Sequence, residues 1–101
     1  MKIVYRPAAV NDIAAAADYI SDVLKNPIAA SKFKDRILAG IALLRDNPLM
    51  GMLLSDKFDS VKNDYRFIVI NKHLVFYRLC DETVEIVRLL DGRTDYLSHL
   101  F

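Results

Sequence analysis

The chain runs YRFIVINKHLVFYRLCDETVEIVRLL from Tyr65 to Leu90, and this stretch decides the fold. It contains three runs rich in the aromatic and β-branched residues that favour strands, at residues 65–70, 73–80 and 83–90. Asn71-Lys72 and Asp81-Glu82 separate these runs as two-residue turns, so each neighbouring pair is expected to form a hairpin. The stretch therefore predicts a three-stranded antiparallel meander.

Before the meander, the sequence predicts a short strand and two helices. Residues 2–5 are strand formers and stop before Pro7, which suits the first turn of a helix. Apolar residues then recur at three-and-four spacing over roughly residues 7–24 and again from Pro27 to about Asp46, with Asn26 as a helix cap. Residues 49–64 show neither the helical repeat of apolar residues nor the alternation of a strand, and are interpreted as a loop.

The predicted class is α+β, and residues 1–101 are expected to form one domain. The order is an N-terminal strand, an αα-hairpin, the three-stranded antiparallel meander and a short C-terminal tail. We expect the first strand to join the meander and both helices to cover one face of the sheet.

Composition narrows the functional classes. The formal net charge of +1 disfavours a general polyanion binder, because non-specific nucleic-acid affinity comes largely from Lys and Arg. Cys80 is the single cysteine, and no Cys/His cluster has zinc spacing, so we expect neither a metal nor another cofactor. The start of the chain lacks a secretory pattern and no apolar run is long enough to span a bilayer, which predicts a cytoplasmic protein without membrane contact.

Two-residue turns fix the register of the meander, pairing Ile70 with His73, Arg66 with Tyr77, Val75 with Arg88 and Arg78 with Glu85. One face then carries an apolar set that we expect to pack on the helices: Tyr65, Phe67, Val69, Leu74, Phe76, Val87 and Leu89. The other face is expected to receive a partner or the tail, and includes Ile68, Ile86 and Leu90. A β-bulge would exchange the faces.

In this register Arg66, His73, Tyr77 and Arg88 converge on the second face. Arg binds phosphate oxygens bidentately, His titrates near neutrality, and Tyr stacks on bases or transfers protons, so the set suits anion recognition. A solvated sheet face with ordinary packing is the alternative interpretation. The tail is expected to dock on the sheet with Arg93 and His99 directed at the site, through Tyr96, Leu97, Leu100 and Phe101.

Residues 73–78, the acidic turn at 81–82 and residues 86–96 resemble the C-terminal signature of RelE/ParE toxins, and the order of elements agrees with that superfamily. The resemblance implies the toxin of a bacterial type II toxin-antitoxin module, a class linked to growth inhibition and plasmid stabilisation. It also implies a partner, an antitoxin encoded by an adjacent gene, that masks the active surface.

The superfamily holds two activities, so the fold alone does not choose the target. RelE-like members are mRNA interferases that cut mRNA on the ribosome without a metal, and this reading implies the catalytic set Arg66, His73, Arg88, Arg93 and His99. ParE-like members poison DNA gyrase. For either activity, the expected surface for target or antitoxin is Arg66, Ile68, Tyr77, Ile86, Arg88 and Tyr96.

Three departures from the nuclease pattern, the formal net charge of +1 and the ParE-like run at residues 86–95 favour gyrase inhibition slightly. His73 and His99 stand near positions where RelE-like nucleases have Arg and Tyr, and a Lys-rich patch is not evident. Whether the chain is an enzyme stays open at this point. A third alternative is a non-toxic assembly domain.

Overall fold

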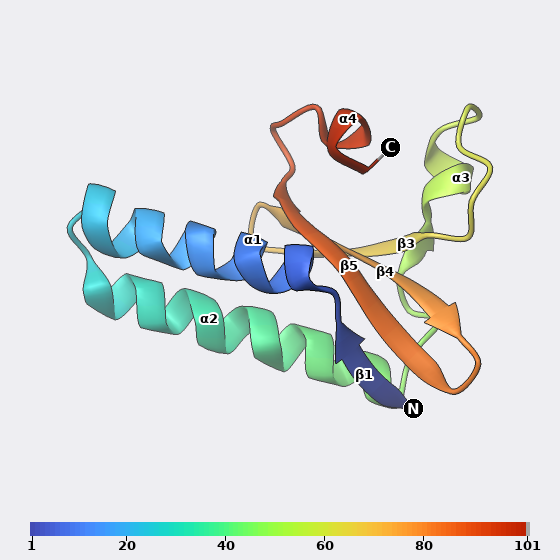
Figure 1. The fold of residues 1–101 in the computed structure, drawn as a ribbon, viewed down its shortest axis with the longest axis horizontal. Helices are drawn as coiled ribbons and strands as arrows, with labels where there is room; N and C mark the ends of the chain where they lie inside the picture. Colours follow the sequence, from blue (N-terminus) through green and yellow to red (C-terminus); the bar gives the residue numbers. More distant parts are fainter. Residues whose placement is uncertain (101) are drawn as a thin grey trace.

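The computed structural model describes residues 1–100 and contains a five-stranded sheet with a long helical hairpin (Figure 1). In chain order the elements are β1 (Lys2–Tyr5), α1 (Pro7–Asp18), the π-helix η1 (Tyr19–Val23), α2 (Pro27–Ala42), the 3-10 helix η2 (Leu43–Arg45), β2 (Met52–Leu53), α3 (Leu54–Lys57), β3 (Arg66–Ile70), β4 (His73–Cys80), β5 (Thr83–Asp91) and α4 (Tyr96–Leu100). This order confirms the predicted α+β class.

The sheet has the strand order β1-β5-β4-β3-β2. The meander of β3, β4 and β5 is antiparallel, and β1 joins it by pairing in parallel with β5, as predicted. Both two-residue turns also form. Asn71 and Asp81 take φ values of 55° and 56°, in the left-handed region that Asn and Asp tolerate better than most residues.

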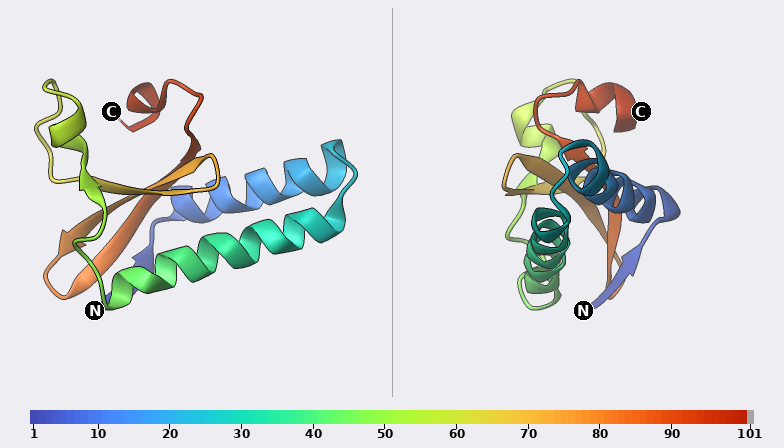
Figure 2. Two further views of the ribbon diagram at one scale, coloured as in Figure 1. Left: turned by 180° about the vertical axis from the view of Figure 1, so that it is seen from behind. Right: turned by 90° about the vertical axis from the view of Figure 1, so that its left-hand side faces the viewer.

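The helical hairpin follows the start signals in the sequence. Pro7 opens α1 after an extended Arg6, and the Asn26 side chain caps α2 by accepting a hydrogen bond from Ala29 N at 3.0 Å. One stripe of each helix is buried: Ala9, Ile13 and Ala17 in α1, and Ala30, Phe33, Ile37 and Ile41 in α2. Figures 1 and 2 show that the turn between the helices projects beyond the sheet.

The predicted loop at residues 49–64 is corrected by two short elements. β2 extends the sheet by pairing Met52 with Phe67 and Leu53 with Arg66, and α3 follows as a single helical turn. Elements of two and four residues are too short to show a helical or strand repeat of apolar residues, so the sequence did not predict them. The segment still contacts the core through buried Leu54 and Val61.

The predicted assignment of sheet faces is wrong. The helices pack on the face that was expected to be open, which carries Ile68, Ile70, Val75, Tyr77, Leu79, Val84 and Ile86. Residues 54–65 and α4 cover the other face, on the apolar side chains of Phe67, Leu74, Phe76 and Val87. Both faces are apolar and both are covered, so hydrophobicity alone could not tell which layer meets the helices (Figures 1 and 2).

A β-bulge in β5 changes the register halfway along the strand. Tyr77 pairs with Ile86 but Phe76 pairs with Arg88, so Val87 is an extra residue. The predicted pairs Ile70–His73, Arg66–Tyr77 and Arg78–Glu85 are confirmed. The predicted pair of Val75 with Arg88 is wrong, because Val75 faces Leu89. Beyond the bulge, Leu89 packs on the helix side and Arg88 lies opposite Phe76.

Candidate functional site

Arg66 and Tyr77 lie opposite each other on β3 and β4 and together hold the connection between α2 and β2. The Tyr77 hydroxyl donates to the Pro48 carbonyl at 2.8 Å and accepts from Gly51 N at 2.9 Å. Arg66 Nη1 donates to the Gly51 carbonyl at 2.8 Å. Burial raises the pKa of Tyr77 and so keeps its hydroxyl protonated. The two side chains fasten a loop to the sheet.

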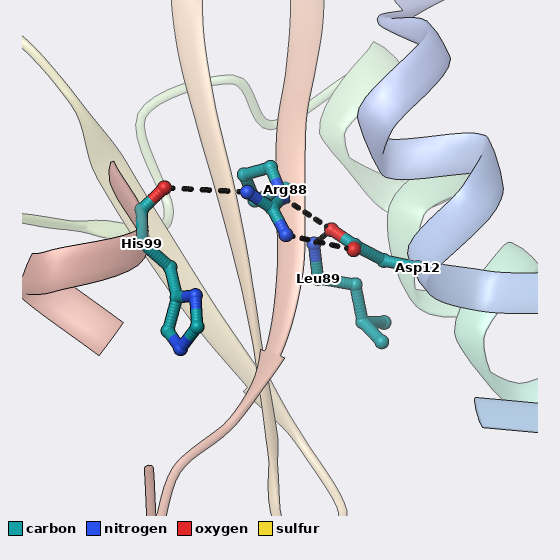
Figure 3. A network of polar contacts seen from close by, with 4 residues as sticks. All are labelled: Asp12, Arg88, Leu89 and His99. Carbon is teal, nitrogen blue, oxygen red and sulfur yellow. Dashed lines mark hydrogen bonds and ion pairs between the residues drawn. The ribbon is translucent and has the colours of Figure 1, made fainter. Parts of the chain in front are cut away.

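Arg88 is clamped between α1 and α4 rather than exposed on a binding face (Figure 3). Its Nε and Nη2 bind the two carboxylate oxygens of Asp12 at 2.6 Å and 2.9 Å, and its Nη1 donates to the His99 carbonyl at 3.2 Å. Hydrogen bonding to Asp12 raises the pKa of Arg88 further above its usual range. The guanidinium therefore joins three elements.

Asp12 also binds a backbone amide at the edge of the sheet. β1 ends at Tyr5, whereas β5 continues to Asp91, so the second half of β5 has no strand beside it on that edge. Asp12 Oδ2 accepts a hydrogen bond from Leu89 N at 3.0 Å there (Figure 3). The Asp12 carboxylate thus takes the place of a neighbouring strand as the hydrogen-bond partner of this backbone amide.

His73, Asp91 and Arg93 line a cleft between the far end of the helical hairpin and the ends of β4 and β5. Two cavities, of about 620 and 340 Å³, share these three side chains and Ile20. Phe33, Asn71 and Lys72 also line the larger cavity, and Ala16, Tyr19 and Leu24 also line the smaller one. We call this region the His73 cleft.

His73 sits half-buried in the cleft, with its ring edge towards Phe33 at a centroid distance of 5.0 Å. Burial lowers the pKa of His73, with a smaller opposing contribution from Asp91, so the imidazole is neutral at physiological pH. Its Nδ1 is buried and has no hydrogen-bond partner within residues 1–100. A polar atom in this state is unusual, because buried polar atoms normally find a partner.

Asp91 and Arg93 form a hydrogen-bonded ion pair at the mouth of the cleft. Arg93 Nε and Nη2 donate to the two carboxylate oxygens at 3.1 Å and 2.8 Å, and Arg93 N donates to Oδ1 at 2.9 Å. These contacts hold the pKa of Asp91 well below its usual range. The bonds to Asp91 orient the Arg93 guanidinium. Its side chain is 77% exposed, so the guanidinium is still open to solvent.

A π-helix forms one wall of the cleft. η1 continues α1 over Tyr19–Val23, and this rare helix type is frequent at functional sites. None of its residues is buried. Tyr19 and Leu24, which line the smaller cavity, are 55% and 56% exposed. Two large apolar side chains therefore stand open to solvent beside the charged groups of the cleft.

The predicted convergence of Arg66, His73, Tyr77 and Arg88 is wrong. Arg66 and Tyr77 lie at the α2–β2 loop, His73 lies at the opposite end of β4, and Arg88 faces Asp12. The bulge moves Arg88 off the face that carries Tyr77. The helices then bury that face, so the expected exposed site does not form.

Several residues expected to bind a target or antitoxin are inaccessible. Tyr77 and Ile86 are fully buried, and Ile68 packs against the helix-side core. Tyr96 is buried beside Phe76, at a ring centroid distance of 5.5 Å, so the prediction that the tail docks on the sheet is confirmed, but it docks on the face that was expected to receive the helices. Phe101, expected to dock with it, lies outside the described residues.

Sequence reasoning missed both carboxylates that organise the arginines. Asp12 precedes Arg88 by 76 positions, and nothing local in the sequence connects them. Asp91 stands two residues before Arg93 in an Asp-Gly-Arg turn, which is a short-range signal that could have indicated an ion pair. The apolar wall of the cleft was also missed, because Ile20 and Phe33 were assigned only to the core stripes of the helices.

The described residues form neither a metal-binding cluster nor a membrane-spanning helix. Within residues 1–100, no group of three or more His, Cys, Asp or Glu side chains is placed to hold a metal ion. In the same part of the chain, no helix has the length and apolar character needed to cross a membrane. What the cleft offers is fixed positive charge, a neutral imidazole and an apolar wall.

Comparison with known proteins adds a family and a fold. The family model described as ParE toxin of type II toxin-antitoxin system, parDE, matches residues 3–96. A solved structure described as the chromosomal ParDE TA system from P. aeruginosa superimposes with a TM-score of 0.75 at 19% sequence identity, over 90% of this chain and 95% of that chain. At this identity the structural likeness establishes the fold. No curated protein matches the sequence.

Proposed function

We propose that this chain, which belongs to the ParE toxin family of type II toxin-antitoxin systems, arrests growth by binding and inhibiting DNA gyrase. The family match spans residues 3–96, and ParE-like members of the superfamily poison gyrase. One structural observation carries the choice of mechanism: each arginine that a nuclease would need is already bound to an oxygen of the protein itself. Inhibition by protein contact does not require the three arginines to meet at one phosphate.

The disposition of the three arginines argues against RNA cleavage. Arg66 is bound to main-chain carbonyls, Arg88 to the Asp12 carboxylate and Arg93 to the Asp91 carboxylate, at three separate places on the sheet. Binding one phosphate with all three would require them to converge from these separate places. The formal net charge of +1 offers no compensating attraction for RNA.

The proposed partner in the resting state is a cognate antitoxin encoded by an adjacent gene. An apolar groove of about 290 Å³ lies between α1 and α2, and includes Val10, Ile13 and Leu38. Val10 and Leu38 are exposed, and the groove reaches Tyr5 on the edge strand β1. Exposed apolar grooves beside an open strand edge are surfaces that protein partners cover, so this groove supports the proposal of a protein partner.

Expression in bacteria tests the proposal. Inducing the chain alone should stop growth and leave a reporter plasmid relaxed, while primer extension finds translated mRNA intact. Co-expression of the antitoxin should restore growth and supercoiling. Relaxed plasmid with uncut mRNA is the pattern expected of a gyrase inhibitor.

The variant His99→Gln separates this mechanism from RNA cleavage. Only the main-chain carbonyl of His99 takes part in the clamp with Arg88, so the substitution leaves that contact in place (Figure 3). A gyrase inhibitor should remain toxic with Gln at this position. Cut mRNA, together with loss of toxicity in His99→Gln, would establish the nuclease instead. Normal growth on induction of the unmodified chain would favour the non-toxic assembly domain.

A further inference from the structure

The His73 cleft combines an apolar wall with a positively charged mouth. The wall comes from the helical hairpin, through Ile20 and Phe33 and through Tyr19 at the rim. Tyr19 lies on η1 at the rim and is 55% exposed, whereas Ile20 of the same helix packs against the core. The wall suits a large apolar side chain supplied by another molecule.

The charges at the mouth favour an anion. Lys72 and Arg93 bring two positive charges, and Asp91 brings one negative charge that is already bound to Arg93. The bonds to Asp91 use Nε and Nη2 of Arg93, so within residues 1–100 the Nη1 group is left for an incoming acceptor. The guanidinium is pre-positioned, which lowers the entropy cost of binding a carboxylate.

We infer that the His73 cleft binds a segment of a partner protein in which a carboxylate stands next to a large apolar side chain. The carboxylate meets Arg93 and Lys72, and the apolar side chain lies against Ile20 and Phe33. His73 lines both cavities, so its ring contacts the segment. The inference rests on the proposed function, and it deepens it by naming the chemistry of the segment that is bound.

The shape of the cleft favours a peptide over a free phosphate or a nucleic acid. A phosphate would use only the charged mouth and would leave the apolar wall exposed. The two cavities, of about 620 and 340 Å³, adjoin along His73 and accommodate neighbouring side chains of one segment. A polynucleotide would bring many charges to a region whose balance, counted over Lys72, Asp91 and Arg93, is a single positive charge.

Selection of short random peptides displayed on phage, with the full chain as bait, tests the inference. The enriched peptides should carry Asp or Glu beside Leu, Ile or Phe. Each winning peptide is then synthesised with its acid intact and with the acid replaced by its amide. The amide form should bind at least about tenfold more weakly, since it loses a charge-assisted hydrogen bond.

Variants of the chain locate the binding. Lys72→Gln should weaken the winning peptide by about threefold or more, because Lys72 is exposed and lines the cleft. Lys32→Gln removes the same charge from an exposed position on α2 that lines neither cavity, and should leave affinity unchanged. Nuclear magnetic resonance should show the His73 ring nitrogens shifting when the peptide is added, and not when adenosine monophosphate is added at the same concentration.

Three results would overturn the inference: enriched peptides without an acid, equal effects of Lys72→Gln and Lys32→Gln, or tighter binding of adenosine monophosphate than of any peptide. Failure here is distinct from failure of the proposed function. Gyrase inhibition by a chain whose cleft binds no peptide would remove only the inference. Peptide binding by a chain that leaves gyrase unaffected would remove only the proposed target.

Discussion

At the scale of single residues, the clamp of Asp12 and Arg88 has the clearest energetic role. The two side chains are only 15% and 26% exposed, so their interaction is weakly screened by solvent. Asp12 also accepts the hydrogen bond from Leu89 N, which ties the carboxylate to the edge of β5 (Figure 3). Removing Arg88 would therefore leave a largely buried carboxylate without its cation.

We predict that Arg88→Ala lowers the free energy of unfolding by about 2–3 kcal/mol, because Asp12 loses its charge partner. Urea denaturation followed by circular dichroism measures the change. Lys32→Ala is the matched control at an exposed helical position, and it should stay within about 0.5 kcal/mol of the unmodified chain. Equal stabilities of the two variants would contradict a structural role for Arg88.

His73 makes a prediction about pH. Its pKa is lowered by burial in the folded state, so between the folded pKa and the unfolded value of about 6.5 the unfolded chain binds a proton that the folded chain does not. Stability should therefore fall as pH drops below about 6.5. His73→Gln should lose this dependence. Urea midpoints at pH 7 and pH 5 for both proteins test it, and parallel declines would exclude His73 as the cause.

At the scale of elements, Tyr77 decides how the α2–β2 connection lies on the sheet. Its hydroxyl bridges Pro48 and Gly51, and a β-carbon added at Gly51 would come within 2.5 Å of that hydroxyl. A glycine at this position lets the loop approach the ring, and the ring in turn satisfies the main chain of the loop.

Tyr77→Phe should lower the free energy of unfolding by about 1–3 kcal/mol, because it leaves buried groups of the loop without a partner. Hydrogen exchange at the Gly51 amide should become faster in the same variant. Tyr19→Phe is the control, since Tyr19 is largely exposed. An unchanged Gly51 exchange rate in Tyr77→Phe would mean that the hydroxyl does not hold the loop.

The elements show how far the sequence could be interpreted. Asn71-Lys72 and Asp81-Glu82 predicted both turns correctly because Asn and Asp tolerate the left-handed backbone that each turn needs. The bulge at Val87 was not predictable, since no residue there demands it and its effect is a shift of one position. The faces were confused because both are apolar, and only three-dimensional packing assigns the helices to one of them.

The candidate site was predictable only where its contacts are local. Arg66 was correctly placed opposite Tyr77, because a two-residue turn fixes their pairing. The clamp of Arg88 depends on Asp12 in another element, and no pattern in one sequence reports such a distant pair. The roles of His73, Arg93 and His99 in binding or catalysis stay predictions.

At the scale of the whole molecule, three arginines of the sheet and of the turn after it make contacts that stabilise the fold. Arg66 holds a loop, Arg88 joins α1, β5 and α4, and Arg93 fixes the turn after β5. With a formal net charge of +1, the molecule has no general field that would gather RNA. This charge distribution supports the proposed action by contact with a protein target.

Titration of purified DNA gyrase with the purified chain tests this account most directly. Relaxed plasmid, ATP and a fixed amount of gyrase are incubated with increasing toxin, and the product is resolved by gel electrophoresis. The account predicts that supercoiling is progressively lost as toxin increases, and that it returns when antitoxin is added. Full supercoiling at a large molar excess of folded toxin would contradict it.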